Sequence, residues 1–190
     1  MKEIEVLFEV PNHSVEDLIA RFSEYRFVGT LETTDEYFFN PGSGAFAPSE
    51  SLRLTDSFRV RTKDGKNYIA VKKDHFLEND IWSYSDEYET EIGDADVMKH
   101  ILHQLGFDQL VIIKNKKHTF ISDEYEVVVE EVENLGVFIE VESLDQEAED
   151  EDVTRIKLEI IELLKRKGIT VTGELNMGKP ELMLRKLRSR

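Results

Sequence analysis

Basic and acidic side chains recur in this sequence at a spacing of two residues. Arg59 and Arg61 flank a valine, and Glu140 and Glu142 flank another valine in the same way. Residues two apart in a β-strand point to the same face of a sheet, so each pair would project together. Guanidinium groups match phosphate oxygens, and clustered carboxylates repel one another unless a cation lies between them. The spacing therefore favours a site for a phosphate-bearing ligand and a metal ion.

The charges that share a strand face are sorted by sign from strand to strand. The basic set is Arg59, Arg61, Lys72, Lys114 and Lys116, on three predicted strands. The acidic set is Glu3, Glu5, Glu87, Glu89, Glu140 and Glu142, on three others. An inert wet face is the alternative, because antiparallel sheets commonly expose one face to water. A wet face would mix the two signs within a strand, so the sorting favours a shared functional interior.

The elements that would position these charges are mostly strands. Period-two alternation predicts eight of them, at 3–10, 35–46 with its terminal loop, 58–62, 67–73, 84–92, 110–120, 125–132 and 137–142. Helical spacing predicts helices at 15–22, 97–105 and 153–164, with a further short helix from Pro180. Strands and helices do not alternate regularly, so parallel βαβ units are not expected and the sheet should be mostly antiparallel.

The expected fold class is α+β, with a mostly antiparallel, eight-stranded closed β-barrel and helices packed outside it. Eight strands are enough to close a barrel, and closure removes exposed strand edges. Apolar faces such as Ile4, Val6 and Phe8 would pack beneath helices, while the charged faces would line a tunnel. Carboxylate oxygens of this kind suit Mg²⁺ or Mn²⁺, and Mg²⁺ commonly bridges carboxylates to substrate phosphates.

Length and composition set further limits. The 190 residues, 40% of them hydrophobic, are expected to form a single domain spanning 1–190. The formal net charge of −16 argues against nucleic acid as a partner. The start MKEIEV lacks the features of a signal peptide and no run of apolar residues is long enough to span a membrane, so a cytoplasmic location without a membrane partner is expected. The chain has no cysteine, which excludes disulfides and thiolate metal sites.

Five segments, in order and spacing, resemble the CYTH family of triphosphate tunnel proteins, which includes class IV adenylyl cyclases and thiamine triphosphatases. The first strand of this family has the pattern E-x-E-x-K, and Glu3-Ile-Glu5-Val-Leu7 resembles it. The later family segments are similar to DEYFFNP, FRVRTKDGKNYIAVKK, DEYETEIGDADVMKHILHQLGF and EEVENLGVFIEVE. The similarity covers residues 2 to 142 well and the remaining tail poorly.

The resemblance implies a tunnel that binds a small-molecule triphosphate (ATP, thiamine triphosphate or tripolyphosphate) together with Mg²⁺ or Mn²⁺. The implied metal ligands are Glu3, Glu5, Glu130, Glu140 and Glu142, with Glu87 and Glu89 as additional members. The implied phosphate-binding residues are Arg59, Arg61, Lys72, Lys114 and Lys116. Glu3, Glu5 and Lys72 are the residues expected to act in catalysis. A homodimer is also implied, because members of the family often pair.

Three functions stay open at this point. The segment spacing is most similar to class IV adenylyl cyclases, in which the ribose 3′-hydroxyl attacks the α-phosphate of ATP and pyrophosphate leaves. An inorganic or thiamine triphosphatase is the second, with water attacking the terminal phosphate. Two departures from the family pattern, Leu7 for a lysine and Ser85 where a basic residue is common, favour a third, a catalytically weak nucleotide- or polyphosphate-binding module. Lys179 is a candidate replacement for the lost charge, whereas Lys73 falls on the other face of its strand.

Overall fold

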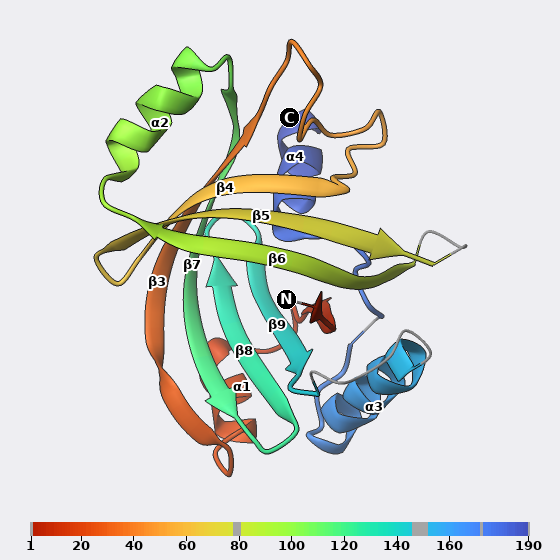
Figure 1. Cartoon of the computed structure of the whole chain (residues 1–190). Helices are drawn as coiled ribbons and strands as arrows, with labels where there is room; N and C mark the ends of the chain where they lie inside the picture. Colours follow the sequence, from red (N-terminus) through yellow and green to blue (C-terminus); the bar gives the residue numbers. More distant parts are fainter. Residues whose placement is uncertain (1, 78–80, 146–151, 172, 190) are drawn as a thin grey trace.

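The computed structural model describes residues 2–77, 81–145, 152–171 and 173–189 of the chain (Figure 1). Every strand in these ranges belongs to one antiparallel sheet, in the order β1-β6-β5-β4-β3-β7-β8-β9-β2. The strands are β1 (Lys2–Glu3), β2 (Glu5–Glu9), β3 (Arg26–Phe39), β4 (Asp56–Lys63), β5 (Lys66–Phe76), β6 (Trp82–Ile92), β7 (Asp108–Ile121), β8 (Tyr125–Val132) and β9 (Gly136–Ser143).

The two ends of this sheet meet in the N-terminal strand. β1 pairs with β6 and places Glu3 opposite Ser85, whereas β2 pairs with β9 and places Glu5 opposite Glu142. Only Ile4 separates β1 from β2, so one interrupted strand joins both edges of the sheet. With β1 and β2 counted as one, the described strands form the closed antiparallel ring of eight that the sequence predicts.

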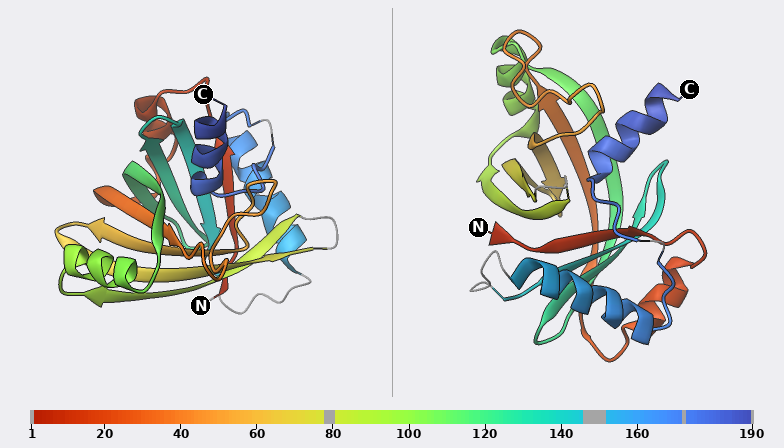
Figure 2. Two further views of the ribbon diagram at one scale, coloured as in Figure 1. Left: turned by 90° about the horizontal axis from the view of Figure 1, so that it is seen from above. Right: turned by 90° about the vertical axis from the view of Figure 1, so that its right-hand side faces the viewer.

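Four helices occur in the described ranges, and they match the three predicted helices and the predicted C-terminal one. They are α1 (Val15–Arg21), α2 (Ala95–Gln104), α3 (Val153–Arg166) and α4 (Lys179–Arg188). In the right-hand view of Figure 2, α3 and α4 lie on opposite sides of the N-terminal strand. Within the described part of the chain, no helix has the length and apolar composition needed to cross a membrane.

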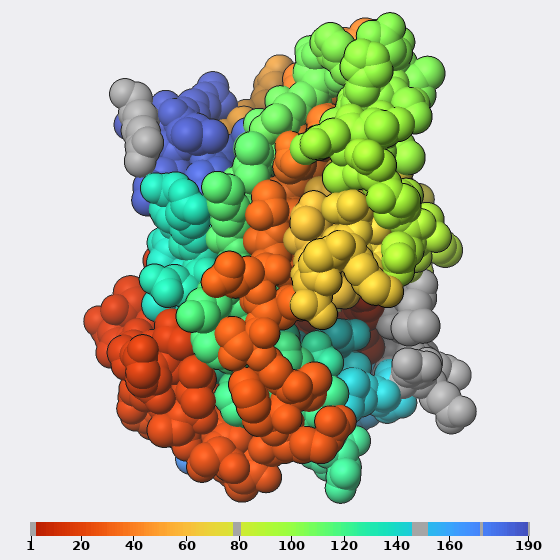
Figure 3. Space-filling view, turned by 90° about the vertical axis from the view of Figure 1, so that its left-hand side faces the viewer, coloured from red at the N-terminus to blue at the C-terminus, as the bar shows by residue number. Residues whose placement is uncertain are grey.

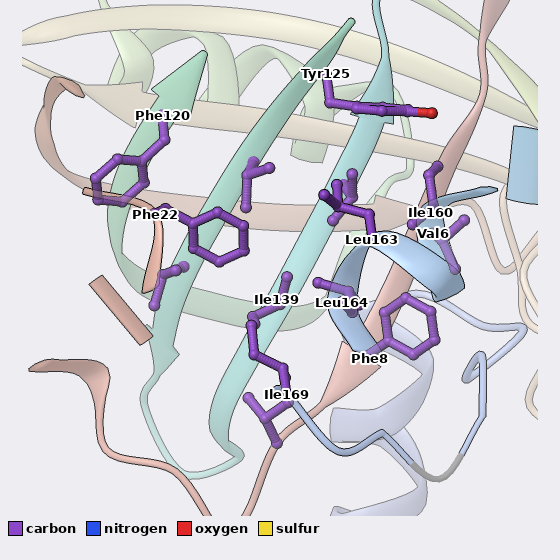
Figure 4. Packing of buried hydrophobic residues seen from close by; sticks show 14 of the residues in the cluster. Val6, Phe8, Phe22, Phe120, Tyr125, Ile139, Ile160, Leu163, Leu164 and Ile169 are labelled. Carbon is purple, nitrogen blue, oxygen red and sulfur yellow. The ribbon is translucent and has the colours of Figure 1, made fainter. Parts of the chain in front are cut away.

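The main apolar core lies outside the ring, beneath α1 and α3 (Figure 4). Val6 and Phe8 of β2 and Ile139 of β9 form one buried cluster with Ile160 and Leu164 of α3. Each fully buried side chain of this size contributes about 1.5–3 kcal/mol relative to an exposed one. Since neighbouring residues of a strand alternate between faces, burying this outer face turns Glu5, Glu140 and Glu142 inward.

A second outer cluster lies between α2 and the middle of the sheet. Phe58 and Val60 of β4 pack with Leu102 of α2. In Figure 3, α2 (green) stands above the yellow turn between β4 and β5, and the orange β3 runs alongside. Burial of Phe58 and Val60 on the outside leaves Arg59 and Arg61 on the inside of the ring.

Helix α4 fills one end of the interior with apolar side chains. Met183 packs there with Leu7, Tyr37, Ile113 and Phe138, which come from β2, β3, β7 and β9. The interior of the ring is therefore apolar at the α4 end and charged beyond it. The sequence-based expectation of charged faces lining a tunnel did not include this apolar end.

The first turn of α4 is tied to the rest of the molecule by Glu181, which is buried. One carboxylate oxygen accepts a hydrogen bond from the backbone N–H of Gly178 at 2.5 Å, and the other accepts one from the N–H of Leu54 at 3.0 Å. Because Leu54 belongs to the segment between β3 and β4, this contact joins α4 to that segment at the closed end of the tunnel.

Candidate functional site

The inside of the ring holds a cavity of about 300 Å³ with a strongly charged wall. Its cations are Arg59, Arg61, Lys63, Lys72, Lys117 and Lys179. Its carboxylates are Glu3, Glu5, Asp35, Asp74, Glu87, Glu126, Glu140, Glu142 and Glu181. The wall thus contains residues from the expected phosphate-binding and metal-binding sets, and its carboxylates outnumber its cations.

The two arginines of β4 are held in place by carboxylates, of which Asp35 is buried. Arg61 donates from Nε and Nη2 to the two oxygens of Asp35, at 2.7 and 2.9 Å, and from Nη1 to Glu89 at 3.1 Å. Arg59 donates to Glu87 and, at 3.4 Å, to the hydroxyl of Tyr37. Burial alone would raise the pKa of Asp35, but the adjacent Arg61 lowers it to about 2. Asp35 is therefore ionised and fixes the plane of the Arg61 guanidinium.

Lys72 of β5 projects between the acidic strands, as its position in the sequence predicts. Its Nζ pairs with Glu5, lies 3.2 Å from Glu3 and lies 3.9 Å from Glu87. Burial opposes the charged form of this lysine, but Glu5 and Glu3 outweigh that effect and raise the pKa of Lys72. The lysine thus neutralises two carboxylates that the family resemblance assigns to a metal ion.

Glu142 lies opposite Glu5 and is the least compensated carboxylate of this group. Burial raises the pKa of Glu142 to about 8, and the neighbouring carboxylates Glu3, Glu5, Glu126 and Glu140 act in the same direction. Among the described residues, no ion pair reaches its side chain. A cation beside Glu142 would relieve this repulsion.

The carboxylates fit a divalent metal in their chemistry and their placement. Glu3, Glu5, Glu140 and Glu142 face one cavity from adjacent strands, and their oxygens are ligands that Mg²⁺ and Mn²⁺ prefer. In the described ranges, however, no three acidic or histidine side chains converge as a ready-made metal site. Lys72 occupies the position between Glu3 and Glu5, so it would have to turn away before these residues could share a metal.

A lysine from α4 enters the cavity beside Leu7. Lys179 Nζ lies 2.5 Å from Glu130 and 2.6 Å from Glu140. Leu7 is the cross-strand partner of Glu140, so Lys179 delivers its charge close to where a lysine at position 7 would project. Glu130, an expected metal ligand, is fully buried and bound by Lys179 and by the amide of Asn115 at 3.0 Å.

The expectation that Lys114 and Lys116 line the tunnel is wrong, because both are exposed on the outer face of β7. The side chain of Lys114 is 56% exposed, whereas Asn115 and Lys117 line the cavity. The prediction had the wrong phase for this strand. Ile113, Asn115 and Lys117 line the cavity instead, and Ile113 packs in one cluster with Met183 of α4.

Ser85, where the family pattern commonly has a basic residue, joins a hydrogen-bond network with Asp74 and Trp82. Its hydroxyl donates to Asp74 at 2.7 Å and accepts from the indole Nε1 of Trp82 at 3.0 Å. Burial raises the pKa of Asp74 to about 6. Asp74 lies two residues after Lys72 and also lines the cavity, as the period of two along a strand predicts.

A closed ring of antiparallel strands, with arginines and a lysine facing carboxylates inside it, defines this protein as a charged β-tunnel. The chain belongs to the CYTH domain family, whose model matches residues 1–172. The match extends beyond the segments compared above and includes α3.

One relative and two solved structures are similar over most of the chain, and the solved structures share its fold. A protein of Methanocaldococcus jannaschii, whose name proposes an adenylate cyclase, is 27% identical over 169 residues, which cover 88% of this chain and 89% of the relative. A solved structure from Pyrococcus horikoshii OT3 has a TM-score of 0.74 and 24% identity, and covers 95% of this chain and 98% of its own. A Hippeastrum protein has a TM-score of 0.68 and 19% identity, with 98% and 96% covered. Its description states that this proposed adenylyl cyclase reveals a dominant triphosphatase activity.

Proposed function

We propose that the protein binds a nucleoside triphosphate together with a divalent metal ion in the tunnel, and converts it in the manner of class IV adenylyl cyclases. The observation that supports this proposal is the convergence of Arg59, Arg61 and Lys72 on one cavity whose opposite wall carries Glu140 and Glu142. Arginine and lysine donate to phosphate oxygens, and the carboxylates suit Mg²⁺ or Mn²⁺.

Arg61 keeps donors available for a phosphate while it is held in place. A guanidinium has five N–H groups, of which Asp35 accepts from two and Glu89 from one. The two remaining N–H groups are one on Nη1 and one on Nη2. A phosphate could therefore bind Arg61 without displacing Asp35, and the buried pair would stay intact.

Lys72 is the residue whose partners would change most. In the proposed complex its ammonium leaves Glu3 and Glu5 and donates to the phosphate chain. The two glutamates, with Glu140 and Glu142, would hold Mg²⁺ or Mn²⁺. When bound, the metal supplies charge neutralisation of the phosphates and polarises the bond that breaks.

For ATP the proposed reaction joins the ribose 3′-oxygen to the α-phosphorus. The bond from the α-phosphorus to the bridging oxygen of the β-phosphate breaks, and cyclic AMP, pyrophosphate and a proton are released. The similarity to the Methanocaldococcus relative over most of both chains supports this choice.

Hydrolysis of a triphosphate is the second candidate function. Leu7 and Ser85 remove two charges that the family pattern places around the ligand, and Lys179 supplies only one near Leu7. Hydrolysis by water requires less exact placement of the organic part of the ligand than cyclisation does. The triphosphatase activity named for the Hippeastrum protein gives this candidate further support.

Thermal unfolding with product analysis tests the proposal. The purified protein is heated with ATP or tripolyphosphate, with and without Mn²⁺, and cyclic AMP, pyrophosphate and phosphate are assayed. A rise in Tm that needs both triphosphate and metal is expected. Arg61→Lys keeps a positive charge beside Asp35 but loses the guanidinium N–H groups, so it should reduce this rise in Tm. Lys116→Ala, on the outer face, should leave the rise unchanged.

Each product identifies one candidate. Cyclic AMP supports the cyclase, and phosphate without cyclic AMP supports the triphosphatase. A metal-dependent rise in Tm without any product would leave a binding module. Wild-type protein whose Tm responds to no triphosphate would overturn the proposal.

A further inference from the structure

An uncharged pair of polar side chains interrupts the charged wall of the tunnel. Thr33 of β3 and Asn115 of β7 are cross-strand partners, and both line the cavity. Both are buried, with 5% of each residue exposed. Asp35 and Lys117 lie two residues further along the same strands and also face the cavity, and both form ion pairs.

Each member of the pair has a buried polar atom without a partner. The Oγ1 of Thr33 and the Oδ1 of Asn115 have no hydrogen-bond partner among the described residues. Asn115 donates from Nδ2 to Glu130 at 3.0 Å, which assigns the remaining amide atom as an acceptor. Burying such atoms without hydrogen bonds costs stability, so each one requires an explanation.

Fold stability does not require a hydroxyl at position 33. Valine has nearly the same shape as threonine and a high preference for strands, and it would leave no polar atom unsatisfied. Thr34 provides a comparison, because it is the next residue on the same strand but points to the opposite face. A buried hydroxyl at Thr33 that costs stability and faces the cavity points to a ligand.

The chemistry of the two atoms limits what that ligand group can be. An amide oxygen only accepts hydrogen bonds, and a threonine hydroxyl can accept or donate. The ionised oxygens of a triphosphate have no hydrogen to donate, so they do not suit Asn115 Oδ1. A neutral O–H group suits both atoms at once.

We propose that Thr33 and Asn115 form a subsite for a neutral O–H group at the reacting end of the ligand, either a ribose hydroxyl or the water that attacks a phosphate. The inference rests on the proposed function and names the part of the reactants that this wall binds. Lys117, the next inward residue after Asn115, is tied to Glu130 and Glu140 only at 3.9 Å. A phosphate can draw this lysine away and open the space in front of the pair.

Thr33→Val, Thr33→Ser and Thr34→Val test the subsite. For each protein, Tm is measured without ligand. The Kd values with Mn²⁺ are then measured for ATP, 2′,3′-dideoxy-ATP and tripolyphosphate, and turnover is followed for ATP and tripolyphosphate. Thr33→Val should raise the ligand-free Tm by about 2–6 °C, because it removes an unsatisfied buried hydroxyl. Thr33→Ser keeps the hydroxyl and should bind and turn over like wild type.

The source of the O–H group decides the rest of the pattern. If it is a ribose hydroxyl, Thr33→Val should weaken ATP binding about five- to tenfold, the loss of one hydrogen bond, without weakening the dideoxy analogue. If it is the attacking water, all Kd values should stay as in wild type while turnover of both substrates falls by a similar factor.

Two results would overturn the subsite. One is Thr33→Val behaving like Thr34→Val in binding and turnover. The other is an equal loss of binding for all three ligands, which would indicate a general disturbance of the tunnel. Wild-type protein that binds none of the three ligands would instead refute the proposed function, and the subsite with it.

Discussion

Replacing Glu142 with glutamine should stabilise the protein in the absence of metal and weaken its response to metal. The pKa of Glu142 is raised from 4.5 to about 8 by burial and by its carboxylate neighbours. The folded state therefore holds a proton that the unfolded state releases near pH 4.5, and the free energy of unfolding falls as the pH rises from 4.5 to 8. Glutamine cannot ionise, so the variant avoids this loss.

The size of the effect follows from the pKa shift. At about 1.4 kcal/mol per unit, the shift sets an upper limit of about 4–5 kcal/mol at pH 8 and above. Glu142 is only partly buried, and screening by solvent reduces this limit to about 2 kcal/mol. For a chain of this length, the Tm of Glu142→Gln should exceed that of wild type by about 4–8 °C at pH 8.5 and by little at pH 5.

Thermal unfolding at pH 5 and pH 8.5, with and without Mn²⁺, measures both parts of the prediction. Glu131→Gln serves as the matched control, because Glu131 is exposed on the outer face of the neighbouring strand β8. Its Tm should follow wild type under all four conditions. With Mn²⁺ at pH 8.5, wild type should gain more than Glu142→Gln. If Glu142→Gln is less stable than wild type at pH 8.5 without metal, Glu142 is ionised and compensated, and the reasoning is refuted.

Three further substitutions test the other charged and apolar parts of the tunnel. Lys179→Met removes the nearer cation of buried Glu130 and leaves only Lys117 at 3.9 Å, so it should lower the free energy of unfolding by about 3 kcal/mol in urea titrations. It should also weaken metal-dependent tripolyphosphate binding at least tenfold in calorimetry, and unchanged binding would exclude Lys179 as a replacement for the missing lysine. Asp35→Asn should lower the free energy of unfolding by about 2 kcal/mol at pH 7. This difference from wild type should vanish as the pH falls from 4 to 2, because the lowered pKa of Asp35 stabilises wild type only above that range. An equal difference in denaturant unfolding at pH 7 and pH 2 would contradict the pairing with Arg61. Met183→Ala leaves a cavity at the α4 end and should lower the free energy of unfolding in urea by about 2 kcal/mol. A decrease below about 0.5 kcal/mol would mean that α4 does not close this end in solution.

Much of the site could be predicted from strand periodicity, because the alternation of faces depends on a local rule. Arg59 and Arg61 alternate with buried Phe58 and Val60, so their inward direction follows from the burial of their neighbours. The same rule places Glu140 and Glu142 together. The expected cytoplasmic location, homodimer and single domain over 1–190 stay predictions.

The errors have one physical source, the apolar end of the tunnel. The periodicity of β7 was correct, but its phase was inverted, because Lys114 and Lys116 were expected to face inward, whereas Ile113, Asn115 and Lys117 do so. A strand whose inner face changes from apolar to polar along its length gives no local signal of which face is inside. The contact between Met183 and Leu7 resolves this ambiguity, and it joins residues at opposite ends of the chain.

The charge balance of the cavity also bears on how a triphosphate could enter it. Carboxylates outnumber cations in the wall, and the best-placed cations are already paired, Lys72 with Glu5 and Lys179 with Glu140. A bare polyanion would meet net negative charge and would have to compete with these carboxylates for every donor. If Glu3 and Glu5 held a divalent cation, its charge would offset the carboxylates, and Lys72 would be free to donate to the phosphates. We therefore expect the affinity for metal and the affinity for triphosphate to be strongly coupled, and tripolyphosphate alone to stabilise the protein little at pH 8, where these carboxylates are ionised.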